Sequence, residues 1–365
     1  MTDLLERLVR PEIRALSAYH VPDSTGLIKL DAMENPYIWP DDLRQEWLDL
    51  LRGVNVNRYP DSHARELIAA LRDAMCVPAE MEILLGNGSD ELIQMLALTV
   101  AAPGRKILSV DPGFVMYRMI GLFAGLRYIG VPLRPEDFSL DLPAVLDALE
   151  REQPELTFLA YPNNPTGNLF ETAAVERIIE AAPGLVVVDE AYAPFTDETF
   201  MQRLGEWPNL LVMRTVSKLG LAGLRLGLLA GPMAWLDEID KTRLPYNINV
   251  LTQVSATFAL RNRGVFEQQT RWIREERARL MAALDDLAGV QPFPSDANFI
   301  LFRVPAGAAC KTFDGLREAG VLVKRLDGAY PLLADCLRVT VGKPEENHAF
   351  VGALRSLMGT SRGQG

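Results

Sequence analysis

Lys218 stands in the segment TVSKLGLAGLRLG, where a lysine could carry out covalent chemistry. A lysine amine that is kept partly deprotonated can form a Schiff base with an aldehyde cofactor, and it can move protons as a general base after a substrate amine displaces it. The same letters would fit a surface lysine in a glycine-rich turn, because lysines are common and usually exposed. Taken alone, this segment therefore favours the interpretation of Lys218 as an exposed surface residue.

Asp189 closes the apolar run LVVVD, 29 positions before Lys218. An unpaired carboxylate at the end of a buried strand is costly, so Asp189 requires a cationic partner. A protonated pyridine nitrogen would serve, because the aspartate would hold that proton and let the ring draw electrons from the Cα of a substrate. An ion pair with a lysine or arginine would satisfy the carboxylate equally well.

Three more side chains could hold such a ring. Tyr192, three positions after Asp189, could donate a hydrogen bond to a ring hydroxyl, and Asn164 in YPNNPTG could contact the same oxygen. Phe114 in DPGFVMY could stack on the face of the ring. Each has an ordinary alternative, since Asn-Pro and Pro-Thr-Gly form turns and a lone phenylalanine packs in a core.

The segment LLGNGSDELIQMLAL offers a place for a phosphate group. Gly88 and Ser89 lie where an apolar strand pattern gives way to a helix, and the free backbone N–H groups at a helix start bind anions. Ser217 and Arg225 would add a hydroxyl and a guanidinium to the same phosphate. The alternative is that Ser89 or Asp90 does no more than cap the helix.

Two arginines interrupt the apolar patterns of C-terminal strands, Arg325 in LVKRLDG and Arg338 in CLRVTVG. An arginine in such a half-buried position often meets an anion, although a structural salt bridge explains it as well. Together the two arginines could clamp a carboxylate or a phosphate of a substrate.

Helical patterns alternate with short apolar runs from about residue 65 to residue 233, which predicts a mostly parallel sheet with helices on both faces. The predicted strands are residues 106–110, 126–131, 156–161, 185–189 and 210–215. Asn164, Asp189 and Lys218 each follow a different strand. Ligands bind at the carboxyl ends of strands in such sheets, so we expect these residues to converge.

The apolar run at residues 226–231 is separated from the preceding strand by only ten residues. A parallel crossover needs a dozen or more, so we expect this strand to be antiparallel. Beyond residue 252, helices at 266–287 and 345–357 and strands near 298–304, 321–325 and 337–341 predict a smaller α+β domain.

Composition and charge narrow the class of protein. A chain of 365 residues, 48% hydrophobic, can bury a large core in two or three domains, and a net charge of −11 argues against nucleic-acid binding as its task. The three cysteines and three histidines are scattered, so neither a disulfide framework nor a metal site is predicted. We expect a cytoplasmic protein, because neither a signal peptide nor a membrane-spanning apolar run is seen.

With these motifs assembled, the chain resembles the fold-type I pyridoxal-phosphate aminotransferases over nearly its whole length, and among them the histidinol-phosphate aminotransferase family. The narrower likeness rests on KLDAMENPY, NRYPDSHARELIAAL, GNGSDELI, YPNNPTGN, DEAY, SKLGLAGLRLG, LPYNIN and CLRVTVG. It implies pyridoxal 5′-phosphate as cofactor. It also implies amino transfer between L-histidinol phosphate and 2-oxoglutarate, giving imidazole acetol phosphate and L-glutamate, in L-histidine biosynthesis.

The resemblance also implies a role for each matching residue. Lys218 would bond to the cofactor aldehyde, Asp189 would hold the ring nitrogen, and Tyr192 would assist at the ring hydroxyl. The implied cofactor-binding residues are Gly88, Ser89, Asp90, Phe114, Asn164, Asp189, Tyr192, Ser217, Lys218, Arg225 and, from the other subunit, Tyr59. That last contact implies a homodimer whose subunits share their active sites.

For the substrates, the resemblance implies that Arg338 receives the carboxylate of glutamate and that Arg325 and Arg338 together receive the phosphate of histidinol phosphate. Tyr19 and Asn35 would close the pocket. We therefore divide the chain into an N-terminal segment (1–38) that packs with the small domain and the partner subunit, a large cofactor-binding domain (39–251), a small domain (252–358) and a disordered tail (359–365).

One departure from the family pattern stands out. Relatives commonly have one more residue between the lysine and the phosphate-binding arginine, as in SKAFGLAG, so a tighter loop is predicted from Lys218 to Arg225. An aromatic amino-acid aminotransferase remains the chief alternative, because imidazole and phenyl rings can share an apolar pocket. A decarboxylase of a phosphorylated amino acid, or a non-catalytic regulatory protein that binds the same cofactor, would also retain these motifs.

Overall fold

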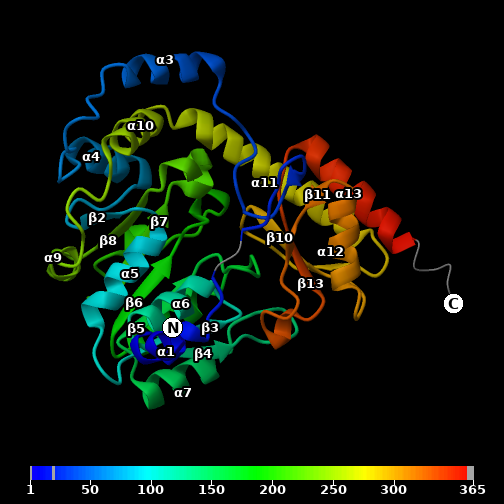
Figure 1. The fold of residues 1–365 in the computed structure, drawn as a ribbon, viewed down its shortest axis with the longest axis horizontal. Coiled ribbons are helices and arrows are strands. Elements are labelled where there is room, and N and C mark those ends of the chain that lie inside the picture. The colour runs from blue at the N-terminus through cyan, green and yellow to red at the C-terminus, as the bar shows by residue number, and fades with distance from the viewer. Residues whose placement is uncertain (1, 19–20, 360–365) are drawn as a thin grey trace.

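The computed structural model describes residues 2–18 and 21–359 and shows a larger and a smaller α/β part (Figure 1). Tyr19 and the predicted tail from residue 360 onward lie outside the described residues. Residue 359, which we assigned to that tail, instead ends helix α13 (Pro344–Gly359). In the described part of the chain, no helix is both long enough and apolar enough to cross a membrane.

A seven-stranded sheet forms the centre of the larger part. In spatial order its strands are β2 (Glu82–Gly86), β8 (Gly227–Gly231), β7 (Leu210–Thr215), β6 (Leu185–Asp189), β5 (Leu156–Ala160), β3 (Lys106–Asp111) and β4 (Arg127–Pro132). Neighbouring strands run parallel, except that β8 is antiparallel to both β2 and β7. The antiparallel strand predicted from its ten-residue connection is therefore confirmed.

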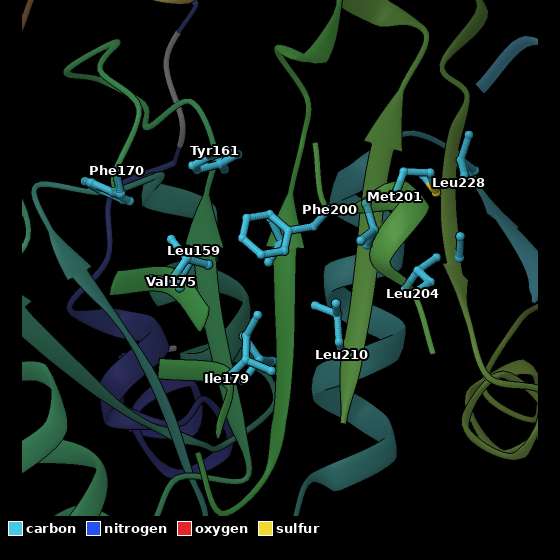
Figure 2. Packing of buried hydrophobic residues seen from close by; sticks show 14 of the residues in the cluster. Leu159, Tyr161, Phe170, Val175, Ile179, Phe200, Met201, Leu204, Leu210 and Leu228 are labelled. Carbon is cyan, nitrogen blue, oxygen red and sulfur yellow. The ribbon is translucent and has the colours of Figure 1, made fainter. Parts of the chain in front are cut away.

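Helices cover both faces of this sheet, which is why its central strands are continuous apolar runs rather than alternating ones. One face carries α4 (Arg65–Met75), α7 (Leu142–Glu152), α8 (Thr172–Ala181) and α10 (Val250–Arg261), and the other carries α5 (Ser89–Val100), α6 (Val115–Phe123) and α9 (Met233–Asp240). Figure 2 shows the first face, where Leu159 and Leu210 of the sheet lie on the same side as Val175 and Ile179 of α8. Phe200, from the loop between β6 and β7, lies on this side as well.

The smaller part is built on an antiparallel sheet. Its strands are β12 (Lys324–Arg325), β13 (Cys336–Thr340), β10 (Phe299–Arg303) and β9 (Gln291–Pro292), packed with α12 (Ala309–Glu318) and α13. The long helix α11 (Gly264–Asp285) joins the two parts (Figure 1). Our boundary at residue 252 falls inside α10, which packs against α3 (Asp41–Leu51) and α4 of the larger part, so we now propose a boundary at α11.

The N-terminal segment returns to the smaller part. After the short helices α1 (Thr2–Leu8) and α2 (Pro11–Arg14), strand β1 (Ile28–Lys29) pairs in parallel with β11 (Val321–Leu322). The Met33 N–H donates to Thr340 Oγ1 at 2.9 Å, and Asn298 Nδ2 donates to the Met33 carbonyl at 3.0 Å. Residues from the two ends of the chain thus share hydrogen bonds.

A buried ion pair fastens the carboxyl ends of β6 and β7. Arg214 Nε and Nη2 donate to the same carboxylate oxygen of Glu190 at 2.8 and 2.7 Å, and the Glu190 side chain has no exposed surface. Thr199 and the Phe200 N–H complete the donors around Glu190. The pair therefore ties the two strand ends to the loop at residues 196–201.

We expect Arg214→Ala to lower the free energy of unfolding by about 3–5 kcal/mol, because it leaves Glu190 as an uncompensated buried charge. The exposed pair of Lys241 and Glu238, 2.6 Å apart, is the matched control, and Lys241→Ala should lower it by less than about 1 kcal/mol. Urea unfolding of the two variants measures the difference. Equal urea midpoints would show that the buried pair does not secure the strand ends.

Candidate functional site

The loops after β5, β6 and β7 enclose one cavity of about 130 Å³ at the carboxyl ends of these strands. Its lining includes Met33, Ser89, Asp90, Phe114, Asn164, Asp189, Tyr192, Ser217, Lys218 and Arg225. A larger hollow of about 780 Å³ lies along α4 and α9 but contains none of these side chains. The chemistry of the lining, rather than cavity size, therefore identifies the candidate site.

Lys218 lies in a wide helical turn (Ser217–Leu221) directly after β7, and Gly220 in this turn has φ 123°. Its Nζ donates to the Ala32 carbonyl at 3.3 Å and lies 5.9 Å from the centre of the Tyr192 ring. Burial lowers the pKa of Lys218 to about 8, and the positive charges of Arg338 and Arg225 add to this effect. Lys218 is therefore more often neutral near pH 8 than an ordinary lysine.

Asp189 is 4% exposed, and each of its carboxylate oxygens accepts a hydrogen bond. Tyr117 Oη donates to Oδ2 at 2.7 Å, and the Ala191 N–H donates to Oδ1 at 3.1 Å. Burial raises the pKa of Asp189 to about 6, while these two hydrogen bonds oppose the rise. Sequence reasoning missed Tyr117, because a tyrosine inside a helix pattern looks like an ordinary core residue.

Asn164 and Tyr192 both line the cavity and are hydrogen-bonded to each other. Asn164 Nδ2 donates to Tyr192 Oη at 3.1 Å, and Arg338 Nη1 donates to Asn164 Oδ1 at 2.7 Å. Burial raises the pKa of Tyr192 above its ordinary value, so its hydroxyl keeps its proton at neutral pH. Arg338 is 6% exposed and also donates to the Asp31 carbonyl at 3.1 Å.

The N-terminus of α5 faces Arg225 across the shortened loop. Gly88 has φ 88°, a conformation that favours glycine, and a Cβ atom there would stand 2.5 Å from Arg225 Nη2. Arg225 itself has φ 48°, and its guanidinium lies 3.5 Å from the Asp90 carboxylate. Ser217 is buried beside Thr215, whose hydroxyl donates to its Oγ at 2.9 Å. The tighter link from Lys218 thus still brings Arg225 to the helix start.

The structure does not place Arg325 beside Arg338. In the pairing of β12 with β13, Lys324 lies opposite Arg338 and Arg325 lies opposite Leu337. Side chains alternate along a strand, so Lys324 shares the face of Arg338 and Arg325 points to the other face. There Arg325 is exposed and donates to Cys310 Sγ at 3.0 Å. Lys324 was not among the residues predicted from the sequence, and its pKa is lowered by burial and then by Arg338.

Asn35 lies behind the Lys218 turn and is absent from the lining of the cavity. Its Nδ2 donates to the Leu219 carbonyl at 3.1 Å and to Gln269 Oε1 at 3.0 Å, so it ties the N-terminal segment to that turn. Tyr59 is 80% exposed and stacks on Tyr246 with ring centres 4.4 Å apart. Tyr59 is also absent from the lining of the cavity. Across residues 2–18 and 21–359, no group of three potential metal ligands is found.

The chain is similar in sequence to known proteins. Residues 25–354 match the family described as aminotransferase class I and II. A protein of Nitrosococcus oceani named histidinol-phosphate aminotransferase 2 is 58% identical over 97% of this chain and 98% of its own length. The histidinol-phosphate aminotransferase of Chromobacterium violaceum is 53% identical over 96% of this chain and 98% of its own length.

A solved structure shares the fold. The histidinol-phosphate aminotransferase of Sinorhizobium meliloti, in complex with pyridoxal-5′-phosphate, superposes with a TM-score of 0.86 at 24% identity. The superposition covers 97% of this chain and 98% of that one.

We expect Lys218 to react with an aldehyde at lower pH than other lysines. Reductive methylation followed by peptide mass spectrometry should give half-maximal labelling of Lys218 near pH 8, against a pKa of about 10.4 for an ordinary exposed lysine. Arg338→Gln should move that midpoint upward, because it removes a positive charge that lowers the pKa. Arg325→Gln removes the same charge on the far face and should not move it. A Lys218 midpoint equal to that of exposed lysines would contradict the burial argument.

Proposed function

The chain belongs to the class I and II aminotransferase family, and we propose that it transfers an amino group between L-histidinol phosphate and 2-oxoglutarate in L-histidine biosynthesis. The single observation that carries the proposal is the convergence of Lys218, Asp189 and Asn164 on one cavity, with the buried Arg338 bonded to Asn164. The relatives that share more than half of their residues with this chain support the choice of substrate.

The residues of the cavity fit pyridoxal 5′-phosphate, which supplies an aldehyde for a lysine and a ring that draws electrons from the substrate Cα. Asp189 is a buried carboxylate that needs a positive partner, and a protonated ring nitrogen is one. Lys218 has a pKa of about 8, so a substantial part of it is the neutral amine near pH 8, as bond formation with an aldehyde requires. Gly88 leaves room for the Arg225 guanidinium at a helix N-terminus, where phosphates bind.

We propose the following division of work among these side chains. Lys218 would bond to the cofactor aldehyde and, once displaced by the substrate amine, its Nζ would be free to accept the proton from the substrate Cα and to donate it to the former aldehyde carbon of the cofactor. Tyr192 and Asn164 hold the ring hydroxyl, and Phe114 stacks on the ring face. The proposed phosphate ligands are Gly88, Ser89, Ser217 and Arg225, and Asp90 holds the Arg225 guanidinium in place.

Arg338 and Lys324 would bind the substrate anions. Arg338 is fixed by Asn164 and the Asp31 carbonyl, so its guanidinium is preorganised for a carboxylate. Lys324 lies opposite Arg338 in the β12–β13 pairing, so we propose that it adds the second charge needed for the phosphate of histidinol phosphate. We assign Asn35 to support of the Lys218 turn rather than to contact with substrate.

We also propose a cytoplasmic homodimer in which Tyr59 reaches the cofactor phosphate of the partner subunit. Tyr59 is exposed and outside its own cavity, as such a role requires. Apolar side chains are exposed on the two segments that the Tyr59–Tyr246 stack joins, and these are Val56, Tyr59, Leu244, Tyr246 and Leu251. Exposed apolar groups of this kind mark an interface.

The substrate is tested by steady-state rates with histidinol phosphate and with phenylalanine. We expect a higher kcat/KM for histidinol phosphate in the wild-type enzyme. Lys324→Gln should lower that value about tenfold by removing a charged contact to the phosphate, while it spares phenylalanine, which has no phosphate. Arg325→Gln, the neighbouring change on the opposite face, should alter neither value. A preference for phenylalanine would instead make this an aromatic amino-acid aminotransferase.

The shared site is tested by complementation between inactive subunits. We expect co-expressed Tyr59→Ala and Lys218→Ala chains to form hybrids with one complete site, giving about a quarter of wild-type activity at limiting cofactor if subunits mix at random. Lys218→Ala with Arg225→Ala is the control, because both residues belong to one cavity and their hybrid has no complete site. Equal failure of both mixtures would exclude the contribution of Tyr59 from the partner.

A further inference from the structure

We propose that Tyr117 is a positioning residue for the cofactor, because its hydroxyl holds the Asp189 carboxylate in the orientation and the ionised form that a protonated ring nitrogen requires. The inference rests on the proposed cofactor chemistry and concerns a side chain that is absent from the lining of the cavity. Tyr117 lies in α6, is fully buried, and contacts Asp189 from 72 positions away in sequence.

The two hydrogen bonds to Asp189 come from different elements. Oδ1 accepts the Ala191 N–H, which is fixed by the backbone that follows β6. Oδ2 accepts the Tyr117 hydroxyl at 2.7 Å, and this donor comes from a helix on one face of the sheet. With both oxygens held, the plane of the carboxylate is set from two sides. Loss of the phenol would leave a buried oxygen that the N–H of Ala191 cannot also satisfy.

Two aromatic contacts restrict the ring of Tyr117 and so keep its hydroxyl beside Asp189. It stacks on Phe158 of β5 with ring centres 4.7 Å apart and an interplanar angle of 12°. It also meets Phe114 edge to face, with centres 5.4 Å apart. Phe114 lines the cavity, so one ring supports both the carboxylate and the proposed stacking residue.

The charges around Asp189 make this hydrogen bond important for its ionisation. Burial raises the pKa of Asp189, and the negative charges of Asp90 and Glu190 raise it further. The Tyr117 hydroxyl is the largest opposing influence and the Ala191 N–H is the next. Burial, together with the nearby charge of Asp189, raises the pKa of Tyr117, and Tyr192 acts in the same direction. Tyr117 therefore remains a donor, and its removal would favour a neutral Asp189.

The test compares Tyr117→Phe with Tyr128→Phe. Tyr128 is a matched control, because its hydroxyl also donates to a carboxylate, Asp111 Oδ1 at 2.9 Å, outside the cavity. Thermal unfolding of the cofactor-free proteins shows whether each variant folds. We then measure the dissociation constant of pyridoxal 5′-phosphate, and the ¹⁵N chemical shift of bound cofactor labelled at its ring nitrogen, as a function of pH.

We expect Tyr117→Phe to weaken cofactor binding about tenfold or more. The ¹⁵N signal should also show ring deprotonation at a lower pH than in the wild type, whereas Tyr128→Phe should change neither quantity. In an Asp189→Ala background, Tyr117→Phe should have almost no further effect on binding, because the phenol acts through that carboxylate. Wild-type affinity and ¹⁵N titration in folded Tyr117→Phe protein, or an undiminished effect without Asp189, would overturn the inference.

These measurements need no amino-acid substrate. A wild-type protein that binds the cofactor and shows the expected Tyr117 effects, but does not use histidinol phosphate, would contradict the proposed substrate and leave the role of Tyr117 standing. Conversely, a Tyr117→Phe protein that uses histidinol phosphate and is unchanged in both cofactor measurements would contradict the role of Tyr117 and leave the proposed substrate standing.

Discussion

The cavity is organised around one negative charge that the fold keeps away from water. Asp189 ends a fully buried strand, where an isolated carboxylate would be strongly unfavourable. The fold supplies two hydrogen-bond donors to it, and the proposed cofactor supplies the positive partner. Burial in this dry setting also lowers the pKa of Lys218, and the positive charge of Arg338, which acts more strongly here than it would in water, lowers it further.

Side chains of adjacent residues in an extended chain point to opposite faces, and at two places this separates two like charges that are neighbours in the sequence. Asp189 lines the cavity, whereas the next residue, Glu190, is bound by Arg214 on a different side of the chain. In the smaller part, Lys324 lies on the face of Arg338 and its neighbour Arg325 lies on the opposite face. Because adjacent side chains point apart, like charges can stand next to each other in sequence and serve unrelated purposes.

The same geometry explains which features were predictable from the sequence. The strands at residues 185–189 and 210–215 were predicted to the residue, because continuous apolar runs mark strands buried on both faces. Residues that directly follow such strands, including Lys218, could be expected at one edge of the sheet.

Contacts between distant elements could not be predicted in the same way. The choice of Arg325 over Lys324 depended on how β12 is aligned with β13, and a shift of one residue exchanges the two faces. Tyr117 contacts Asp189 only because α6 folds back over the sheet. Asn35 lies in the KLDAMENPY motif near the N-terminus, but its position behind the Lys218 turn also depends on Gln269 of α11.

The hydrogen bond between Met33 and Thr340 joins residues 307 positions apart, so it can form only after nearly the whole chain has been synthesised. A chain emerging from the ribosome carries Lys218 and Asp189 long before β11 exists to pair with β1 or Arg338 exists to hold Asn164. The large sheet can therefore fold early, since domains form in N-to-C order during synthesis. The contact of Arg338 with Asn164 can therefore form only after β13 has been synthesised, so this wall of the site is completed last.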